Sequence, residues 1–279
     1  MDFLNKPIVH ITNGAYIIFT QNTLGLSHRY AFYMIVLNCT CYGITVCLLA
    51  IHFIYRYLAL CKAHLMKLFT FPYTIIWIVF FLAISSDWWF SGVNFTTETA
   101  EIDQVIEKSI IKFYNLTRGQ YIYAGNLYYR VDSTTGIKSL SWPDLFYMMN
   151  IVKIITICFS IVFFCGIKTY RTMQTYNFIS KKTHDLQQQL FHALIVQTII
   201  PTVTMFLPAG AVIILPIFEI TLGSVESLIL TIISTYPCFD PIVIIYFVKD
   251  YRNTVITFLT RWKNNDIVTQ NKTMPSTNS

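Results

Sequence analysis

The sequence contains little charge and none of the short motifs that mark common enzymes and metal sites. Only 12% of its 279 residues are charged, whereas about a quarter of the residues in a soluble domain are. It has no HExxH motif, no nucleophile elbow and no paired cysteine spacing of the kind that holds zinc or haem. We therefore expect no enzyme, no metal site and no cofactor.

The chain also lacks the patterns of several other protein classes. Residues 1–29 have no basic start followed by a compact apolar stretch, so we expect no removable signal peptide. All seven cysteines lie in or beside apolar stretches, where small buried residues are typical. The net charge is +6, but the basic residues lie between apolar stretches and form no single soluble face, so we expect no nucleic-acid binding.

Apolar residues, by contrast, make up 54% of the chain and gather in long stretches. A helix needs about 20 such residues to cross the core of a lipid bilayer. Five stretches meet this length, at residues 30–55, 68–86, 145–167, 190–218 and 227–248. They predict an all-α, polytopic transmembrane helix bundle, with an extracellular segment at 1–29 before it and a cytoplasmic tail at 249–279 after it.

Prolines interrupt the last two of these stretches. Pro201, Pro208 and Pro216 lie within the fourth and predict kinks, because proline removes a backbone donor. In the fifth, Asp240 directly precedes Pro241 and is the only acid inside any stretch. An acid within a membrane is unfavourable and usually has a role. We interpret Asp240 as a conformational switch or an ion site, with a local cap on the kinked backbone as the alternative.

The distribution of lysine and arginine predicts which ends of the helices face the cytoplasm. The loops at 56–67 and 168–189 and the C-terminal tail hold 12 basic residues in 65 positions, against 7 in 95 positions on the opposite side. Basic loops stay on the cytoplasmic side, so we expect the N-terminus outside and the C-terminus inside. The sequons at Asn94 and Asn115 then fall in an extracellular loop, 87–144, where Asn115 is the better glycosylation candidate because it is farther from both helices.

The loop at 87–144 carries a structural pattern of its own. Its first half has apolar residues at three- and four-residue spacing, which predicts an amphipathic helix: Ile102, Val105, Ile106, Ile110 and Phe113. In its second half, aromatic and branched residues flank an Ala-Gly-Asn segment between Gln120 and Val131, which predicts a β-hairpin. We expect the loop to fold as a lid, because long loops without structure are uncommon.

Three motifs lie within the predicted helices or at their ends. The first, His52-Phe-Ile-Tyr-Arg-Tyr-Leu-Ala-Leu60, places Arg56 at the cytoplasmic boundary, where an interfacial anchor is an alternative explanation. The other two motifs are Gln189-Leu-Phe-His-Ala-Leu-Ile-Val-Gln-Thr-Ile-Ile-Pro201 and Tyr236-Pro-Cys-Phe-Asp-Pro-Ile-Val-Ile-Ile-Tyr-Phe-Val-Lys-Asp-Tyr-Arg252.

Together with Pro7-Ile-Val-His10 and Leu127-Tyr-Tyr129, these motifs resemble, in order, those of the nematode serpentine chemoreceptors of the str and srj type. The resemblance implies a seven-transmembrane G-protein-coupled receptor for an odorant or another small molecule, in the plasma membrane of sensory cilia. The five predicted helices correspond to helices three to seven of such a receptor, so the resemblance implies that the first two are missing.

The resemblance also implies which residues face the G protein. Arg56 takes the position of an arginine at the inner end of the third helix, although the aromatic Tyr55 precedes it in place of an acid. We expect Tyr57 and Arg252 to face the G protein as well.

Candidates for the ligand pocket follow from a receptor's need for an apolar cavity with a few polar groups. Tyr33, Leu37 and Cys41 share one face of the first predicted helix. Met205 lies near the prolines of the fourth, and Tyr236 lies in the fifth. For each of these residues, ordinary packing between helices is the alternative interpretation.

We therefore expect a chemosensory G-protein-coupled receptor that is truncated by two helices. A transporter or channel subunit is one alternative, motivated by the proline-broken fourth stretch and Asp240. A non-functional receptor fragment is another, because polar groups that a complete bundle shields would face lipid. An intramembrane enzyme needs at least two convergent catalytic groups, and Asp240 is alone in its stretch.

Overall fold

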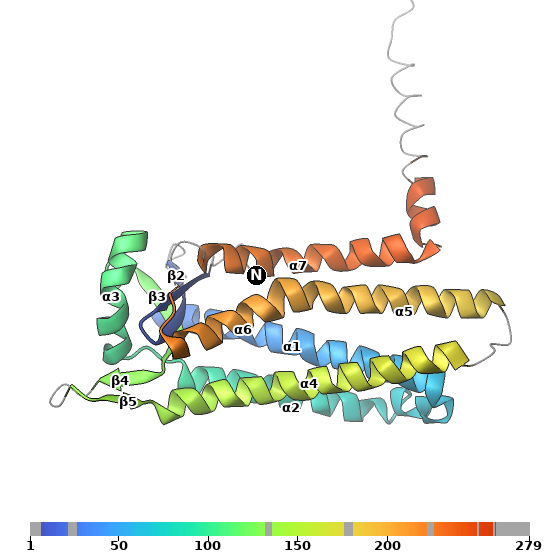
Figure 1. Cartoon of the computed structure of the whole chain (residues 1–279), viewed down its shortest axis with the longest axis horizontal. Helices are drawn as coiled ribbons and strands as arrows, with labels where there is room; N and C mark the ends of the chain where they lie inside the picture. Colours follow the sequence, from blue (N-terminus) through green and yellow to red (C-terminus); the bar gives the residue numbers. More distant parts are fainter. Residues whose placement is uncertain are drawn as a thin grey trace, which may run out of the picture. The chain divides into compact units, whose positions relative to one another are not determined.

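The computed structural model describes residues 7–21, 27–131, 136–175, 181–221, 226–249, 251–258 and 260 (Figure 1). The chain forms two compact units. The first consists of Met1–Tyr176 and Thr204–Ser234, and the second of Asn177–Val203 and Thr235–Ser279. All β-strands of the described residues belong to the first unit.

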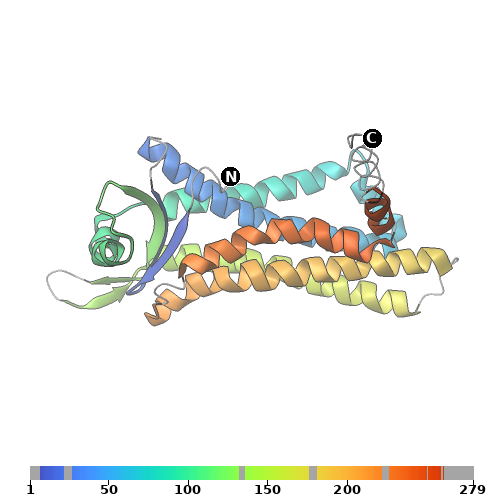
Figure 2. The same cartoon turned by 90° about the horizontal axis from the view of Figure 1, so that it is seen from above.

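Three long helices run together in the first unit: α1 (His28–Cys61), α2 (Thr74–Phe95) and α4 (Trp142–Thr175). Helix α1 packs against both of the others, and α2 packs against α4 (Figures 1 and 2). Helices α1 and α4 extend beyond their predicted spans at both ends. With 34 residues, α1 is about 51 Å long, so part of it extends past a bilayer core of about 30 Å.

The second helix is shifted along the chain from its predicted span at 68–86. Leu68 and Phe69 belong instead to a 3-10 helix, η1 (Ala63–Phe69), and α2 begins at Thr74. Pro72 explains the shift, because a proline disfavours helical backbone at the residue before it. Helix α2 then continues to Phe95, so its last turns contain residues that the sequence placed in the loop.

The fourth predicted span, 190–218, is a succession of helical segments. Helix α5 (Lys181–Pro201) is followed by a π-helix, η2 (Thr202–Phe206), then by α6 (Leu207–Ile214) and a 3-10 helix, η3 (Leu215–Phe218). Each change of helix type lies within two residues of Pro201, Pro208 or Pro216. The missing backbone donor of each proline interrupts the regular hydrogen-bond ladder at these places.

Four helical stretches of the described residues are long and apolar enough to cross a bilayer: His28–Cys61, Thr74–Phe95, Trp142–Gln174 and Asp185–Phe218. They correspond to the first four predicted spans. The fifth predicted span, 227–248, coincides with helix α7 (Glu226–Phe247). The chain is therefore a mostly helical protein with membrane-spanning helices, as its apolar stretches predict.

A small sheet and one helix form a compact substructure in the first unit (Figure 2). The antiparallel sheet has the order β1 (Ile8–Thr12), β2 (Ala15–Gln21), β3 (Tyr121–Leu127), and helix α3 (Ala100–Tyr114) packs on it. We call these four elements the cap. A short hairpin of β4 (Tyr129–Val131) and β5 (Lys138–Leu140) follows β3.

The two faces of the cap sheet pack on different partners, because side chains alternate along a strand. On one face, Ile17 and Tyr123 pack with Ile106 of α3. On the other face, Ile122 packs with Ile35 of α1. The sheet is therefore buried on both sides, and it lies between α3 and α1.

Helix α3 confirms the amphipathic pattern predicted for residues 102–113. Its Ile102, Ile106 and Ile110 are buried in the cap, whereas Phe113 is 49% exposed. The Thr99 hydroxyl accepts a hydrogen bond from the Ile102 backbone N–H at 3.3 Å and caps the first turn. At the other end, Asn115 adopts a left-handed conformation with a φ of 54° and ends the helix.

The predicted β-hairpin between Gln120 and Val131 is wrong. Strand β3 runs straight through Gly125, and its partner is β2 from the start of the chain, with Ile17 opposite Gly125. The glycine serves close approach and not a turn, because a Cβ at residue 125 would lie 2.5 Å from the Tyr16 carbonyl oxygen. The segment at 1–29, to which the sequence assigned no strand, supplies two strands of this sheet.

Candidate functional site

A cavity of about 140 Å³ lies between the cap and the helices of the first unit. Helix α1 lines it with Cys39, Tyr42 and Val46, and α2 lines it with Trp88. No lysine, arginine, aspartate or glutamate is among its lining residues in the described part of the chain. A cavity of about 150 Å³ with apolar walls holds a molecule of the size of benzene. The site therefore suits a small, uncharged molecule.

The remaining walls come from α4, the π-helix η2, α6 and the cap. Tyr147 lies in α4, Met205 in η2 and Gly210 in α6, while Tyr16 and Ile18 of β2 close the side toward the cap. Elements from both ends of the first unit's sequence thus meet around one space. Such a site forms only when the cap is folded onto the helices.

One of the pocket residues predicted from the sequence lines this cavity. Met205 lines it and is 2% exposed. Tyr33, Leu37 and Cys41 do not line it, because α1 turns a different stripe toward the cavity. The ring of Tyr33 instead packs at 6.0 Å from that of Trp89 on α2. The side chain of Tyr236 lies outside the described residues.

The position of Trp88 depends on a glycine in the facing helix. A Cβ at Gly43 of α1 would lie 2.5 Å from the indole ring of Trp88. Only a residue without a side chain permits this approach. A second cavity of about 20 Å³ adjoins the first and shares Tyr16, Cys39, Trp88 and Tyr147 with it. Trp88 therefore lies in a wall that both cavities share.

Buried hydrogen bonds fix the cap side of the cavity. The Tyr16 hydroxyl donates to Asn126 Oδ1 at 3.0 Å, and Asn126 Nδ2 donates to Asp144 Oδ1 at 2.7 Å and to the Phe95 carbonyl at 2.9 Å. Burial, then the nearby Tyr128, raises the pKa of Tyr16 well above its usual range. Tyr16 is therefore a neutral donor. This network ties β2 and β3 to the ends of α2 and α4.

Two consecutive tyrosines after β3 connect the cap side of the chain to α6 and to the 3-10 helix η3. The Tyr128 hydroxyl donates to the Ile213 carbonyl at 3.1 Å, and the Tyr129 hydroxyl donates to the Ile217 carbonyl at 2.7 Å. Proline at residue 216 and the change of helix type at Leu215 leave such carbonyls without their usual partners. The tyrosines of the predicted Leu127-Tyr-Tyr129 motif thus supply hydrogen-bond donors to carbonyl groups of an irregular helical segment.

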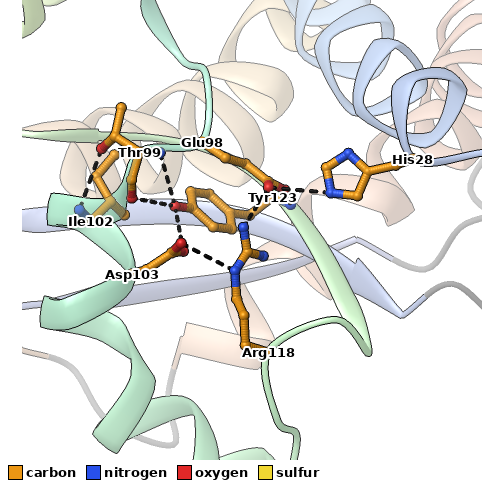
Figure 3. A network of polar contacts seen from close by, with 7 residues as sticks. All are labelled: His28, Glu98, Thr99, Ile102, Asp103, Arg118 and Tyr123. Atoms are coloured by element: carbon orange, nitrogen blue, oxygen red, sulfur yellow. Dashed lines mark hydrogen bonds and ion pairs between the residues drawn. The ribbon is translucent and has the colours of Figure 1, made fainter.

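An ion-pair network connects α3, the segments on either side of it and β3 (Figure 3). Arg118 binds Glu98 Oε2 at 2.6 Å and Asp103 Oδ2 at 3.1 Å, and Glu98 also contacts His28 at 3.2 Å. The Tyr123 hydroxyl donates to Asp103 Oδ1 at 2.9 Å. Burial, then this bond, raises the pKa of Tyr123 well above its usual range. Arg118 is 36% exposed on its side chain, so we assign the network an orienting role more than a stabilising one.

A buried carboxylate links the cap to the first turn of α7. Glu226 Oε2 lies 2.8 Å from His10 Nδ1 and accepts the Ile11 backbone N–H at 3.0 Å, and its side chain is 0% exposed. His10 Nε2 lies 2.9 Å from the Ser109 hydroxyl of α3. Burial and the charge of Glu226 raise the pKa of nearby Tyr114 to about 12.

Three residues of this region, His10, Trp88 and Glu226, were not predicted from the sequence as site residues. One available signal is Asn13-Gly14, which forms the β1–β2 turn with φ of 29° and 82° and is the strongest short-range sign of a hairpin. It predicts the strand that carries His10. No sequence signal distinguishes Trp88 from the other tryptophans.

Two of the predicted G-protein-facing residues lie in the first unit, and the third lies in the second unit. Arg56 and Tyr57 lie near the end of α1, and the Tyr57 ring is 6.1 Å from that of Phe164 on α4. Arg252 belongs to the second unit, where its guanidinium donates to the Tyr246 carbonyl at 3.3 Å.

The remaining predicted residues are placed as follows. Pro201 and Pro208 flank the π-helix η2, and Pro241 lies exposed in α7. The side chain of Asp240 lies outside the described residues. Asn94 is in the last turns of α2, while Asn115 is exposed at the end of α3. Among the described residues, no group of three or more histidine, cysteine, aspartate or glutamate side chains is arranged to hold a metal ion.

The chain is similar to known proteins of one receptor family. The model of the family "Serpentine type 7TM GPCR chemoreceptor Str" matches residues 1–256. Serpentine receptor class r-10 of Caenorhabditis elegans is 28% identical over 95% of this chain and 78% of that receptor. The receptor of the same name in Caenorhabditis briggsae is 28% identical over 94% of this chain and 77% of its own length.

A third relative, G-protein coupled receptor str-33 of Caenorhabditis elegans, is 26% identical over 90% of this chain and 74% of its own length. No solved structure matches the chain. The matches are all to receptors, and none of them favours a transporter or a channel. Receptors of this kind are integral membrane proteins whose partners are a ligand and a G protein. This chain therefore belongs to the Str family of serpentine chemoreceptors and is a chemosensory G-protein-coupled receptor.

Proposed function

We propose that the receptor detects a small, uncharged odorant in the cavity beneath the cap. The observation that carries this proposal is the cavity's composition: its walls are almost entirely apolar, and they come from α1, α2, α4, α6 and β2 together. A ligand that touches all of these elements can favour one arrangement of them over another, which is the requirement for a signal. Met205 in the π-helix is the predicted pocket residue that supports this site.

The same proposal assigns the opposite end of α1 to the G protein. Arg56 and Tyr57 lie near the end of the helix that begins beside the cap, and Lys62 follows directly after it. Basic residues at a helix end mark the cytoplasmic side. We infer that Arg56, Tyr57 and Arg252 face the G protein.

Five membrane-spanning helices belong to this arrangement. We infer that α1, α2, α4, the segments from α5 to η3, and α7 cross the bilayer as the equivalents of helices three to seven of a seven-helix receptor. The cap and the N-terminus then face outside, and the C-terminal tail faces the cytoplasm. Sensory cilia are the proposed site of action, because an odorant receptor must be exposed to the environment.

Filling the cavity tests the proposed ligand site. Gly210 lines the cavity, and a Cβ built there meets no atom within 4 Å, so Gly210→Leu adds bulk without displacing the backbone. We expect this variant to lose the response to an odorant that activates the wild type, or to raise its half-maximal concentration more than about tenfold, since leucine occupies space that the ligand needs. The measurement is a cell-based G-protein reporter assay over a panel of small, uncharged volatile compounds.

Leu207→Phe is the matched control for this variant, because it adds bulk on the same helix at a side chain that is 63% exposed and does not line the cavity. It should respond as the wild type does at equal surface expression. A wild-type response from Gly210→Leu, or a silent wild type over the whole panel, would count against the proposed site.

Glycosylation tests the proposed orientation. Asn115 is exposed at the end of α3. The amide of Asn94, in contrast, donates to the Phe90 carbonyl within α2 at 2.7 Å, and the Thr96 of its sequon is buried. We expect a glycan on Asn115 and none on Asn94, so that Asn115→Gln removes an endoglycosidase-sensitive band shift that Asn94→Gln retains. If the wild-type chain made in a glycosylating cell carries no glycan, the cap does not face the lumen or the outside.

A further inference from the structure

One buried hydrogen-bond donor in the cavity wall has no partner among the described residues. The indole Nε1 of Trp88 is buried and makes no hydrogen bond, and Trp88 as a whole is 7% exposed. Tyr147, which is 6% exposed, brings a second donor, its hydroxyl, to the same wall. Buried donors in proteins are nearly always paired, so each exception calls for an explanation.

The two side chains lie together at one place. Trp88 comes from α2 and Tyr147 from α4, and both line the larger cavity and the adjoining cavity of about 20 Å³. Tyr16 and Cys39 also line both cavities. The Tyr16 hydroxyl already donates to Asn126, and the thiol of Cys39 is a weak donor. Tyr42 lines only the larger cavity, and Thr96, whose hydroxyl donates to the Gly92 carbonyl, lines only the smaller one. The wall that both cavities share therefore offers two strong donors in largely apolar surroundings.

The packing around Trp88 maintains this arrangement. Gly43 admits the indole ring, because any side chain there would overlap it. Gly92, one turn beyond Trp88 on α2, similarly leaves room for Val36 and lies near the Tyr147 hydroxyl, which a Cβ there would approach to 4.0 Å. Two glycines thus bring α1, α2 and α4 close together around the two donors.

From this geometry we propose the chemical class of the ligand: a compact, uncharged molecule with a hydrogen-bond acceptor, such as a carbonyl or ether oxygen, that receives hydrogen bonds from Trp88 and Tyr147. An ion is excluded because the lining residues include no charged group to balance it. An acceptor bound by both donors connects α2 to α4 beside the cap. The inference rests on the proposed function, since it concerns the same cavity.

A matched pair of probes tests the inference on the full chain in lipid nanodiscs. Cyclohexanone and methylenecyclohexane have nearly the same shape, and only the ketone accepts a hydrogen bond. Their apparent affinities follow from the rise of the receptor's unfolding midpoint with probe concentration. Gly210→Leu, in which the leucine side chain is expected to fill the cavity, is the control. A shift of its unfolding midpoint reports any effect of the probes on the lipid alone.

We expect the wild type to bind cyclohexanone about tenfold more tightly than methylenecyclohexane, which corresponds to one or two neutral hydrogen bonds. Trp88→Phe and Tyr147→Phe should each lower the affinity for cyclohexanone by several-fold or more. Each should change the affinity for methylenecyclohexane by less than about twofold. The comparison of probes within each variant separates the lost hydrogen bond from any change of cavity shape. Tyr147→Phe keeps the ring, so it remains informative if Trp88→Phe does not fold.

The possible outcomes separate the two proposals. Equal affinity of the wild type for both probes overturns the inference and leaves the cavity as a ligand site, as would be the case if an ordered water satisfied both donors. If neither probe stabilises the wild type more than Gly210→Leu, the proposed ligand site itself fails, and the inference fails with it.

Discussion

Replacing Glu226 by alanine is expected to destabilise the cap by about 1–3 kcal/mol for each buried hydrogen-bonding group that it leaves without a partner. Glu226 accepts hydrogen bonds from the first strand and is fully buried. Its Oε2 also lies 2.8 Å from Nδ1 of His10, whose Nε2 lies 2.9 Å from the Ser109 hydroxyl. The alanine variant leaves His10 Nδ1 and the Ile11 N–H without this partner.

Hydrogen exchange of the β1 amides measures this effect directly, because the Ile11 N–H is one of the groups released. Glu226→Gln keeps an acceptor oxygen and should lose less protection than alanine. Glu219→Gln is the control, since Glu219 is an exposed acid that pairs with Lys138 on the surface, and it should leave the β1 amides unchanged. Equal exchange in the wild type and Glu226→Ala would show that the buried pair does not hold the hairpin.

Gly125→Ala is expected to separate β2 from β3 and to cost about 3 kcal/mol or more, at the upper end of the range for an overpacked core. The new Cβ would lie 2.5 Å from the Tyr16 carbonyl oxygen and 2.5 Å from Ile17 Cγ2. A clash with backbone cannot be relieved by rotating a side chain, so the strand itself must move. Tyr16 and Ile18 of the same strand line the cavity, and the variant should therefore lose ligand response as well as stability.

Limited proteolysis and the unfolding midpoint measure the loss. Gly210→Ala is the matched control, because a Cβ at that residue meets nothing within 4 Å and alanine favours a helix over glycine. It should be as stable as the wild type or slightly more so. A Gly125→Ala variant with native protease resistance would mean that β2 and β3 are not paired in the membrane-bound protein.

These two predictions describe how the cap is held over the cavity. Glu226 anchors β1 at the start of α7, and Gly125 lets β3 approach β2. Both features lie outside the cavity, yet each positions a strand that closes it. A change in either is therefore expected to act on ligand response through the cap and not through direct contact.

The helices and the family could be predicted from the sequence. An apolar stretch of about 20 residues has few stable alternatives to a spanning helix, so four predicted spans reappear as helices and the fifth coincides with α7. The amphipathic pattern at 102–113 identified α3 for the same kind of reason: its three- and four-residue spacing is a local property of the chain. The receptor motifs agree with the match of the family model to residues 1–256.

The strand pairing in the cap sheet and the identity of the residues that line the cavity depend on tertiary structure. Strand β3 has the composition of a strand, but composition does not say that its partner lies at the start of the chain. For α1, which is apolar on every side, periodicity does not identify the face that meets the cavity. That face is set by simultaneous packing on α2, α4 and the cap, which turns Cys39 and Tyr42 inward in place of Leu37 and Cys41. Local patterns determine which segments become helices and strands, whereas contacts between distant segments determine which side chains meet.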